Sequence, residues 1–269
     1  MLIVVKIGGN VAVEIASSGL IEDLKNVLSE NKVILVHGGG DEVTEVASKL
    51  GKEQKFVVSP EGFRSRYTDK ETVEIYAMVI VGKINKQIVS ILQSKGVPAV
   101  GLSGVDGSLI KADRKKRIIV VDEQGRKRVI DGGYTGKITE VNVSLINFLM
   151  DKGYVPVIAP LAIGEEFEFL NVDADRTAAC IAGALRADRL LLLTDVDGLI
   201  LDGKVVPKLN LSEAEQTLPK IGHGMITKVH AAIEAIKMGV QEVLISSGLR
   251  NVPISSALKH ECGTVLLRE

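Results

Sequence analysis

The chain has 269 residues and a mass of 28.8 kDa, enough for one large domain or two modest lobes around a core that needs no disulfide. Apolar residues make up 46% and charged residues 25%, which excludes wholesale disorder. The formal net charge of -1 argues against a general nucleic-acid coat protein. Aromatic residues, at 3% with no Trp, are too few to stack on single-stranded nucleic acid.

Composition and sequence patterns also predict the cellular location of the protein. No apolar run reaches about 18 residues, so no membrane span is expected. The first ten residues contain neither a basic leader nor a cleavage site, which argues against a secretory signal. Cys180 and Cys262 cannot make a disulfide framework. We therefore expect a cytoplasmic protein that binds neither a membrane nor nucleic acid.

Short apolar runs alternate with segments of helical spacing along the chain. The runs predict buried parallel strands at 2–5, 33–36, 97–102, 155–159, 189–193 and 242–246. The intervening segments predict helices at 20–30, 41–50, 70–94, 142–152, 174–186 and 227–238. This order predicts an α/β fold, a three-layer αβα sandwich around a mostly parallel central sheet. A soft boundary near residue 170 predicts an N-terminal lobe, 1–170, and a C-terminal lobe, 171–269, that share one sheet.

Three stretches interrupt the alternation and predict projecting β-hairpins. The first, 104–136, contains the apolar stretch Ile118–Val121 and a turn at Gln124-Gly125. The second, 199–206, places Asp202-Gly203 between two apolar runs, which is a strong hairpin signal. The third, 163–170, alternates polar and apolar residues near its end.

Two glycine-dense loops follow predicted strands. Lys6-Ile7-Gly8-Gly9-Asn10 follows the first, and His37-Gly38-Gly39-Gly40-Asp41 follows the second and opens a helix. Ligands bind beyond the carboxyl ends of strands in open α/β sheets, and glycine lets backbone N–H groups close around an anion. Either loop alone could be a tight turn, but the pair favours an anion site.

The standard nucleotide motifs are absent from these loops. A dinucleotide fingerprint starting at Gly38 needs a glycine where Val43 stands. The pair Gly136-Lys137 is followed by Ile138 and not by Ser or Thr, so it is no Walker A loop. A third turn, 194–198, follows a strand with Asp-x-Asp-Gly; it is either a simple turn or the place where a nucleotide lies.

Three charged residues occupy positions that need an explanation. Lys6 ends a buried strand, which is costly unless its ammonium group meets an anion or solvent. Lys228 follows a glycine-rich entry into a helix and on its own reads as a solvated first-turn lysine. Asp173 is expected to be a helix N-cap, and Asp175 then gains from the helix dipole without needing another role.

Arginine and lysine also gather in two loops. Arg64 and Arg66 precede a long helix, where guanidinium groups suit carboxylates or phosphates, although a loop arginine is more often only solvated. The runs 114–117 and 126–128 make a basic surface on the first hairpin, either a solvated face or a dock for an acidic partner. The four histidines lack ligand spacing with the cysteines, so no protein metal site is predicted.

Taken together, these motifs resemble the amino acid kinase family and, within it, the acetylglutamate-kinase branch. The matching segments are KIGGN at 6–10, VHGGGDEV at 36–43, RYTD at 66–69, NVDAD at 171–175, LLTDVDG at 192–198 and GHGMITKVHAA at 222–232. Segments 62–69 and 132–138 resemble a narrower subgroup, the kinases that phosphorylate 2-aminoadipate or glutamate attached to LysW, a small acidic carrier protein of lysine and arginine biosynthesis.

The resemblance implies an ATP-dependent carboxylate kinase with assigned residues. Lys6 and Lys228 would stabilise the transferring phosphoryl group, and Asp175 would hold both lysines. The substrate-binding residues would be Gly39, Gly40, Arg64, Arg66 and Asn171. The nucleotide-binding residues would be Gly8, Gly9, Thr194, Asp195, Gly198, Gly224 and Met225. Mg²⁺ would be carried by the ATP phosphates and waters.

The resemblance also implies a homodimer that pairs through the helix at 70–94. Two other functions remain open from the sequence. One is a plain N-acetylglutamate kinase of arginine biosynthesis, which would need no basic dock. The other is a non-catalytic nucleotide-binding sensor, which would keep the glycine loops but have no need of Lys6, Asp175 and Lys228 together.

Overall fold

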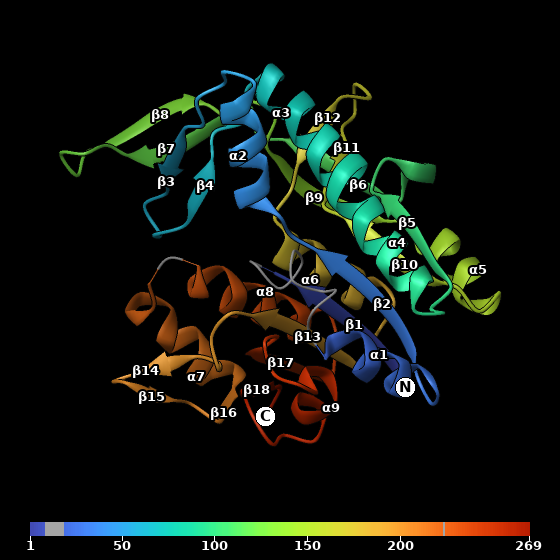
Figure 1. Cartoon of the computed structure of the whole chain (residues 1–269). Helices are drawn as coiled ribbons and strands as arrows, with labels where there is room; N and C mark the ends of the chain where they lie inside the picture. Colours follow the sequence, from blue (N-terminus) through green and yellow to red (C-terminus); the bar gives the residue numbers. More distant parts are fainter. Residues whose placement is uncertain (9–18, 223) are drawn as a thin grey trace.

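An eight-stranded sheet forms the centre of the computed structural model, which describes residues 1–8, 19–222 and 224–269 (Figure 1). Its strands are β1 (Leu2–Ile7), β2 (Lys32–His37), β5 (Ala99–Ser103), β10 (Val155–Ala159), β13 (Arg189–Thr194), β16 (Lys208–Asn210), β17 (Glu242–Ser247) and β18 (Thr264–Leu267). Their order across the sheet is β16-β18-β17-β13-β1-β2-β10-β5, and only the β17–β18 pair is antiparallel. The predicted, mostly parallel sheet is confirmed.

Helices cover both faces of this sheet. They are α1 (Leu20–Leu28), α2 (Gly40–Lys49), α3 (Lys70–Ala77), α4 (Lys86–Ser94), α5 (Ser144–Asp151), α6 (Ala174–Ala184), α7 (Leu211–Thr217), α8 (Met225–Lys237) and α9 (Pro253–Leu258). Side chains of α1, α2, α3, α4 and α9 share one apolar core with one face of the sheet. Those of α5, α6, α7 and α8 share a second core with the other face. The three-layer αβα architecture follows from these two cores.

The alternation of side chains along β1 decides which helices its residues meet. Ile3 and Val5 belong to the core under α1 and α3, whereas Val4 belongs to the core under α6 and α8. Because side chains alternate between faces with a period of two, Lys6 lies on the same face as Val4. On β2 the same rule places His37 on the opposite face, with Leu35.

The predicted helix at 70–94 is present, but its middle is a π-helix, η2 (Met78–Asn85), between α3 and α4. The whole segment is long and apolar enough, by length and composition, to cross a membrane. About half of it faces inward, since 44% of its most apolar window is buried inside the structure. Its residues Val73, Ile80 and Ile88 are buried in the core against the sheet, as in a core helix.

The three predicted hairpins are present, two as separate two-stranded ribbons and the third within a four-stranded sheet. The first stretch forms β7 (Arg117–Val121) and β8 (Lys127–Asp131), which extend from β6 (Ile110–Arg114) and β9 (Gly136–Val141). The other two form β14 (Ile200–Leu201) with β15 (Lys204–Val205), and β11 (Leu161–Ile163) with β12 (Phe169–Asn171). A further hairpin, β3 (Phe56–Val58) with β4 (Arg64–Arg66), was not predicted. Short 3₁₀ turns lie at Asp106–Ser108 and Leu218–Lys220.

The central sheet takes strands from both sides of residue 170. β1, β2, β5 and β10 precede that residue, and β13, β16, β17 and β18 follow it. The proposed lobes, 1–170 and 171–269, therefore share one sheet, and their boundary at residue 170 stays a prediction.

Candidate active site

Lys6 and Lys228 meet on one buried carboxylate. Nζ of Lys6 lies 2.8 Å from Oδ1 of Asp175, and Nζ of Lys228 lies 3.1 Å from its Oδ2. Lys6 forms a close ion pair with the carboxylate, and Lys228 donates a hydrogen bond to it. All three side chains are almost fully buried, with 6%, 13% and 6% exposure for Lys6, Lys228 and Asp175. Residues 222 positions apart in the chain thus share one site, as the sequence analysis required.

Two helix starts bring Asp175 and Lys228 to Lys6. The Asp173 side chain accepts a 2.9 Å hydrogen bond from the backbone N–H of Arg176, so the predicted N-cap of α6 is confirmed. Asp175 then lies in the first turn of α6. Gly224, with φ of +84°, begins α8 and places Lys228 in that helix's first turn. Both helices pack on the face of the sheet that carries Lys6.

The electrostatics of the trio favour an added anion. Burial lowers the pKa of Lys6, and Lys228 lowers it further, although Asp175 opposes both effects. Burial would also lower the pKa of Lys228, but the attraction of Asp175 outweighs it and the pKa is raised. Burial would raise the pKa of Asp175, but the two ammonium groups hold it below its ordinary value. Asp175 is the carboxylate that both ammonium groups contact, while Asp173 acts on both lysines and Asp195 on Lys228 only through space. A phosphate beside the two lysines would stabilise them in their charged form.

The glycine loops lie at the same edge of the sheet. The N–H of Gly8 donates to the Leu193 carbonyl at 3.1 Å, and the N–H of Gly38 donates to the Ile7 carbonyl at 2.8 Å. A Cβ at Gly8 would collide with the ammonium group of Lys6, so a larger residue there would displace that group from its position. The prediction for Gly9 falls outside the described residues.

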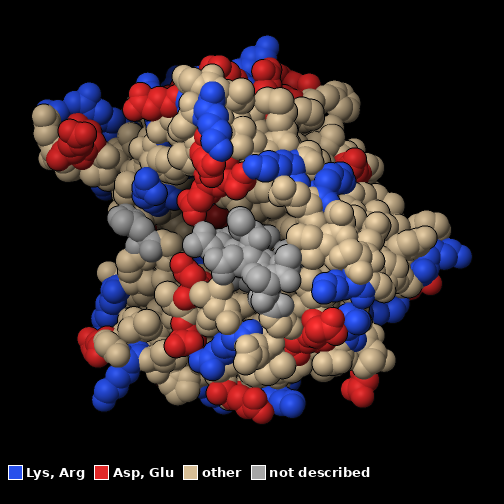
Figure 2. Space-filling model, viewed as in Figure 1, with Lys and Arg blue, Asp and Glu red and all other residues tan. Residues whose placement is uncertain are grey.

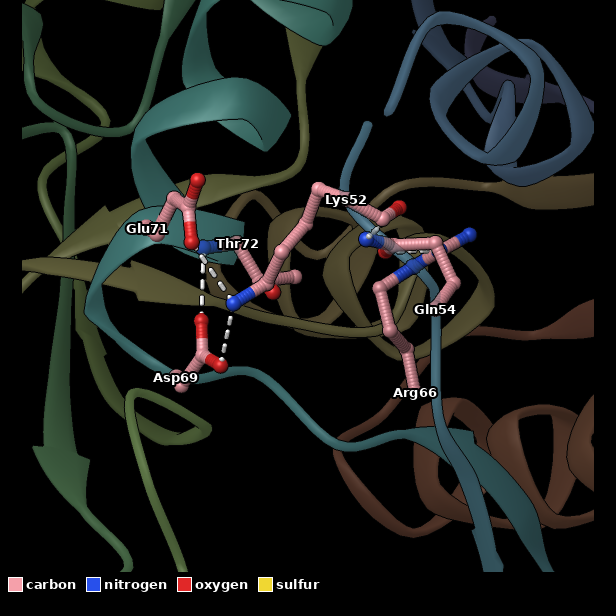
Figure 3. A network of polar contacts seen from close by, with 6 residues as sticks. All are labelled: Lys52, Gln54, Arg66, Asp69, Glu71 and Thr72. Carbon is pink, nitrogen blue, oxygen red and sulfur yellow. Dashed lines mark hydrogen bonds and ion pairs between the residues drawn. The ribbon is translucent and has the colours of Figure 1, made fainter. Parts of the chain in front are cut away.

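Arg66 joins Gly40 at the start of α2. Its guanidinium donates to the Gly40 carbonyl at 2.7 Å, to Thr44 Oγ1 at 2.9 Å and to Gln54 Oε1. Figure 3 shows Arg66 and Gln54 directed toward each other. Burial lowers the pKa of Arg66. Two predicted substrate residues are therefore in direct contact, and Thr44 and Gln54, which no motif indicated, hold the arginine in place.

Asp69, the last residue of the RYTD motif, has a structural role. Asp69 caps α3 by accepting a 2.8 Å hydrogen bond from the N–H of Thr72, and Lys52 pairs with Asp69 and Glu71 at 2.8 and 2.7 Å (Figure 3). Arg64 is exposed, and its guanidinium lies 4.0 Å from the centre of the Phe56 ring. The sequence could not separate the roles of the two arginines, because both lie in the same segment, 62–69.

Asn171 connects the arginine hairpin to α6. Its Nδ2 donates to Thr68 Oγ1 at 3.0 Å, and its backbone N–H donates to the Tyr134 carbonyl at 2.9 Å. Two residues further along the chain, Asp173 caps α6. Asn171 thus lies between the strand that carries Arg66 and the helix that carries Asp175.

The predicted nucleotide residues divide into two groups. Thr194 ends β13 beside β1, its hydroxyl donates to Asp195 Oδ1 at 3.1 Å, and Asp195 is near enough to Lys228 to help raise its pKa. Gly224 and Met225 form the start of α8. Gly198 has a packing explanation instead, since its φ is +151° and a Cβ there would lie 2.8 Å from Thr264 Oγ1.

Across the described ranges, no group of three or more His, Cys, Asp or Glu could hold a metal ion.

Comparisons with known proteins identify the family of the chain. The profile of the amino acid kinase family matches residues 1–247. The chain belongs to the amino acid kinase family. A protein of Nitrosopumilus maritimus is 56% identical over 268 residues, the whole of both chains. A protein of Saccharolobus islandicus named "[LysW]-aminoadipate/[LysW]-glutamate kinase" is 49% identical over 267 residues, 99% of each chain.

Solved structures support the amino acid kinase fold. Smu.665 of Streptococcus mutans superposes with a TM-score of 0.82 at 25% identity, covering 100% of this chain and 99% of that one. The N-acetylglutamate synthase of Neisseria gonorrhoeae superposes with a TM-score of 0.80 at 23% identity, covering 100% of this chain and 59% of that one. The second likeness shows a shared fold alone.

Proposed function

We propose that this amino acid kinase uses ATP to phosphorylate the side-chain carboxylate of 2-aminoadipate or glutamate, or both, attached to a LysW carrier, in lysine and arginine biosynthesis. The observation that carries the proposal is the convergence of Lys6 and Lys228 on Asp175 at the carboxyl edge of the sheet. The relatives named for this activity match over nearly the whole chain. A buried pair of ammonium groups suits a phosphoryl group whose charge shifts during transfer.

In the proposed reaction a carboxylate oxygen of the substrate attacks the γ-phosphorus of ATP in line. A new O–P bond forms as the bond to the ADP oxygen breaks, which yields an acyl phosphate and ADP. Lys6 and Lys228 stabilise the phosphoryl oxygens from two sides, and Asp175 fixes the position of both lysines. Catalysis then consists mainly of positioning and charge neutralisation.

The remaining predicted residues flank this centre. The acceptor would bind to Gly39, Gly40, Arg66 and Asn171, with Arg64 at the exposed end. The nucleotide would bind to Gly8, Gly9, Thr194, Asp195, Gly198, Gly224 and Met225. Mg²⁺ would be held by the ATP phosphates, since the described residues offer two lysines and one engaged carboxylate at the centre, a set that suits phosphate better than a metal cage.

The β7–β8 hairpin would dock the acidic carrier. Figure 2 shows Lys and Arg side chains, with an acidic cluster beside them, on the projection at the upper left, where Figure 1 places this hairpin. Lys116, Arg117 and Lys127 are exposed, and the cross-strand pair Ile119 and Val129 exposes 52% and 63% of its surface. An acidic protein partner fits a surface that combines positive charge with an exposed apolar pair.

Trapping of the acyl phosphate with hydroxylamine tests the function. The enzyme, ATP and Mg²⁺ would be incubated with carrier-linked aminoadipate, carrier-linked glutamate or free N-acetylglutamate. We expect hydroxamate from at least one carrier-linked acceptor and little from the free one. Product from free N-acetylglutamate alone would identify an N-acetylglutamate kinase, and no ATP turnover with any acceptor would favour a nucleotide sensor.

We also propose a cytoplasmic homodimer that pairs through the helix at 70–94. Met78 on η2 is 59% exposed and lines an apolar depression with Val81 and Phe169. Light scattering should give twice the chain mass for the wild type and a lower mass for Met78→Glu. The control is Leu50→Glu, an equally exposed apolar residue at the end of α2. A wild-type monomer, or equal dissociation by both variants, would contradict this pairing.

A further inference from the structure

A fully buried polar network lies beneath the second glycine loop, on the face of the sheet away from Lys228. His37 is the last residue of β2, and Nδ1 of its imidazole ring lies 2.9 Å from the carbonyl oxygen of Gly38. Its Nε2 lies 3.1 Å from Nδ2 of Asn85, the last residue of the π-helix η2. Both side chains are 0% exposed. A π-helical segment in a core helix often marks a functional site.

The partners of Asn85 decide which way its amide points. Its Nδ2 donates to the Val157 carbonyl at 2.9 Å, and its Oδ1 accepts from Lys86 Nζ at 3.1 Å. With the amide nitrogen fixed in this way, Nδ2 presents a hydrogen to Nε2 of His37, which must accept it. The proton of a neutral ring then sits on Nδ1 and is donated to the Gly38 carbonyl.

The surroundings keep the ring neutral. Burial is the main cause that lowers the pKa of His37, to about 4 once the smaller lowering effects of Lys6 and Lys86 and the opposing effect of the hydrogen bond to Gly38 are included. Those two lysines are the charged groups that act on the ring, one from β1 and one from the start of α4. The neutral ring and the Asn85 amide therefore agree on a single tautomer.

This tautomer sets the direction of one peptide group. A trans peptide places its C=O and the following N–H on opposite sides. When the Gly38 carbonyl turns toward the imidazole, the N–H of Gly39 turns away from it. Gly39 has φ of +140°, and a Cβ there would collide with Ile84 of the π-helix, so the loop lies directly on η2. The π-helix thus supports the loop through Ile84 and, through Asn85, the histidine beneath it.

We propose that His37, held in its Nδ1–H form by Asn85, is a positioning residue that orients the Gly39 N–H toward the carboxylate acceptor. The inference rests on the proposed function, because it takes Gly39 as part of the acceptor site. His37 touches no reacting atom. Its contribution belongs in the affinity for the acceptor and not in the affinity for ATP, since the ring lies under the acceptor loop.

Two substitutions at His37 separate orientation from packing. In His37→Asn the side-chain amide nitrogen stands near the place of Nδ1 and can still donate to Gly38. In His37→Gln the amide stands near the place of Nε2 and cannot. We expect the KM for the carrier-linked acceptor to rise about tenfold or more in His37→Gln and at most about threefold in His37→Asn, with the KM for ATP within about twofold in both. Equal acceptor KM values in the two variants, or an equal rise for ATP, would overturn the proposal.

A measurement on the wild type keeps the inference testable if these variants fail to fold. Nitrogen NMR of ¹⁵N-histidine-labelled protein, assigned by substituting the other histidines, should show one ring in the Nδ1–H form that does not titrate between about pH 5 and 8. An Nε2–H ring, or a titration near pH 6.5, would refute the proposed tautomer. If the wild type phosphorylates no carrier-linked acceptor, the proposed function fails, and this spectrum still tests the geometry.

Discussion

At the scale of single residues, Asp175 is the group on which the site depends. Its carboxylate separates two ammonium groups that would otherwise repel each other at close range in a buried setting. Removing it would leave Lys6 and Lys228 without their shared counter-charge. The carboxylate therefore makes it possible for both lysines to stay charged in a place that is ready for a phosphate.

The first prediction concerns Lys228. Replacing it by alanine removes a donor that acts on the developing charge of the phosphoryl group. We expect kcat to fall by about 100- to 1000-fold, equivalent to roughly 2.7–4 kcal/mol. Lys237→Ala is the matched control, because this residue of the same helix is exposed and pairs with Glu215. Steady-state kinetics of both variants decide the matter: near-normal turnover of Lys228→Ala would reject the catalytic role.

Residues in the site differed in how far the sequence could define them. Lys6 was identifiable because a lysine that ends a buried strand needs a partner. From the residues alone Lys228 read as a solvated lysine, and only the family resemblance paired it with Asp175, a contact that the fold then shows at 3.1 Å. Gln54 and Thr44 could not be found, because they hold Arg66 only after three separate elements have packed together.

At the scale of elements, one aspartate joins α9 to α1. Asp23 of α1 is buried, and its carboxylate accepts hydrogen bonds from the N–H groups of Ile254 and Ser255 at 2.7 and 3.0 Å and from the Ser255 hydroxyl. It therefore caps α9 from a distant part of the chain. The contact joins residues 231 positions apart.

The second prediction follows from this cap. Asp23→Ala leaves buried N–H groups without an acceptor, so we expect the free energy of unfolding to fall by about 2 kcal/mol or more. Glu22→Ala on the same helix is the control, since its pair with Lys25 is exposed and worth little. Denaturant unfolding measures both. If both variants lost the same free energy of unfolding, the cap would contribute no more to stability than the exposed ion pair of Glu22.

The third prediction concerns the contact between α6 and α8. Glu234 receives two hydrogen bonds from Arg176, at 2.9 and 2.6 Å, and lies 3.7 Å from His230. Burial would raise the pKa of Glu234, but His230 and Arg176 lower it to about 2. A depressed pKa stabilises the fold above the ordinary value near 4.5, and this stability is lost as the pH falls toward 2. Unfolding measured between pH 5 and about 2 should therefore vary less steeply in Glu234→Gln; an unchanged slope would contradict the assignment.

The helices and strands differ in how well sequence patterns predict them. Short apolar runs predicted six of the eight strands of the central sheet to within two residues, because a buried parallel strand needs continuous apolar side chains. The strands β16 and β18, at one edge of that sheet, were not predicted. The strands β3 and β4 have three residues each and were missed, since so short a run carries no period. The π-helix η2 was read as part of an α-helix, because eight residues cannot distinguish the two periods.

At the scale of the whole molecule, the surface charge of the basic hairpin is less uniformly positive than its sequence indicates. Asp122 pairs with Arg126 and Arg128 at 3.1 and 2.7 Å, so two of its arginines are already engaged. Arg114 donates to the Gly133 carbonyl and stacks 4.1 Å from the centre of the Tyr134 ring. Exposed lysines such as Lys116 and Lys127 are therefore the residues that can meet a partner without disturbing the fold.

The fourth prediction uses those two lysines to test the carrier dock. The double variant Lys116→Glu, Lys127→Glu should raise the KM for carrier-linked substrate by about tenfold or more and weaken its dependence on salt, because exposed charges steer association through a screened field. The KM for ATP should not change. The control, Lys208→Glu with Lys259→Glu, makes the same change in net charge at exposed positions of the C-terminal part of the chain. If the control weakens the carrier equally, the effect belongs to net charge; if neither variant does, the carrier binds elsewhere.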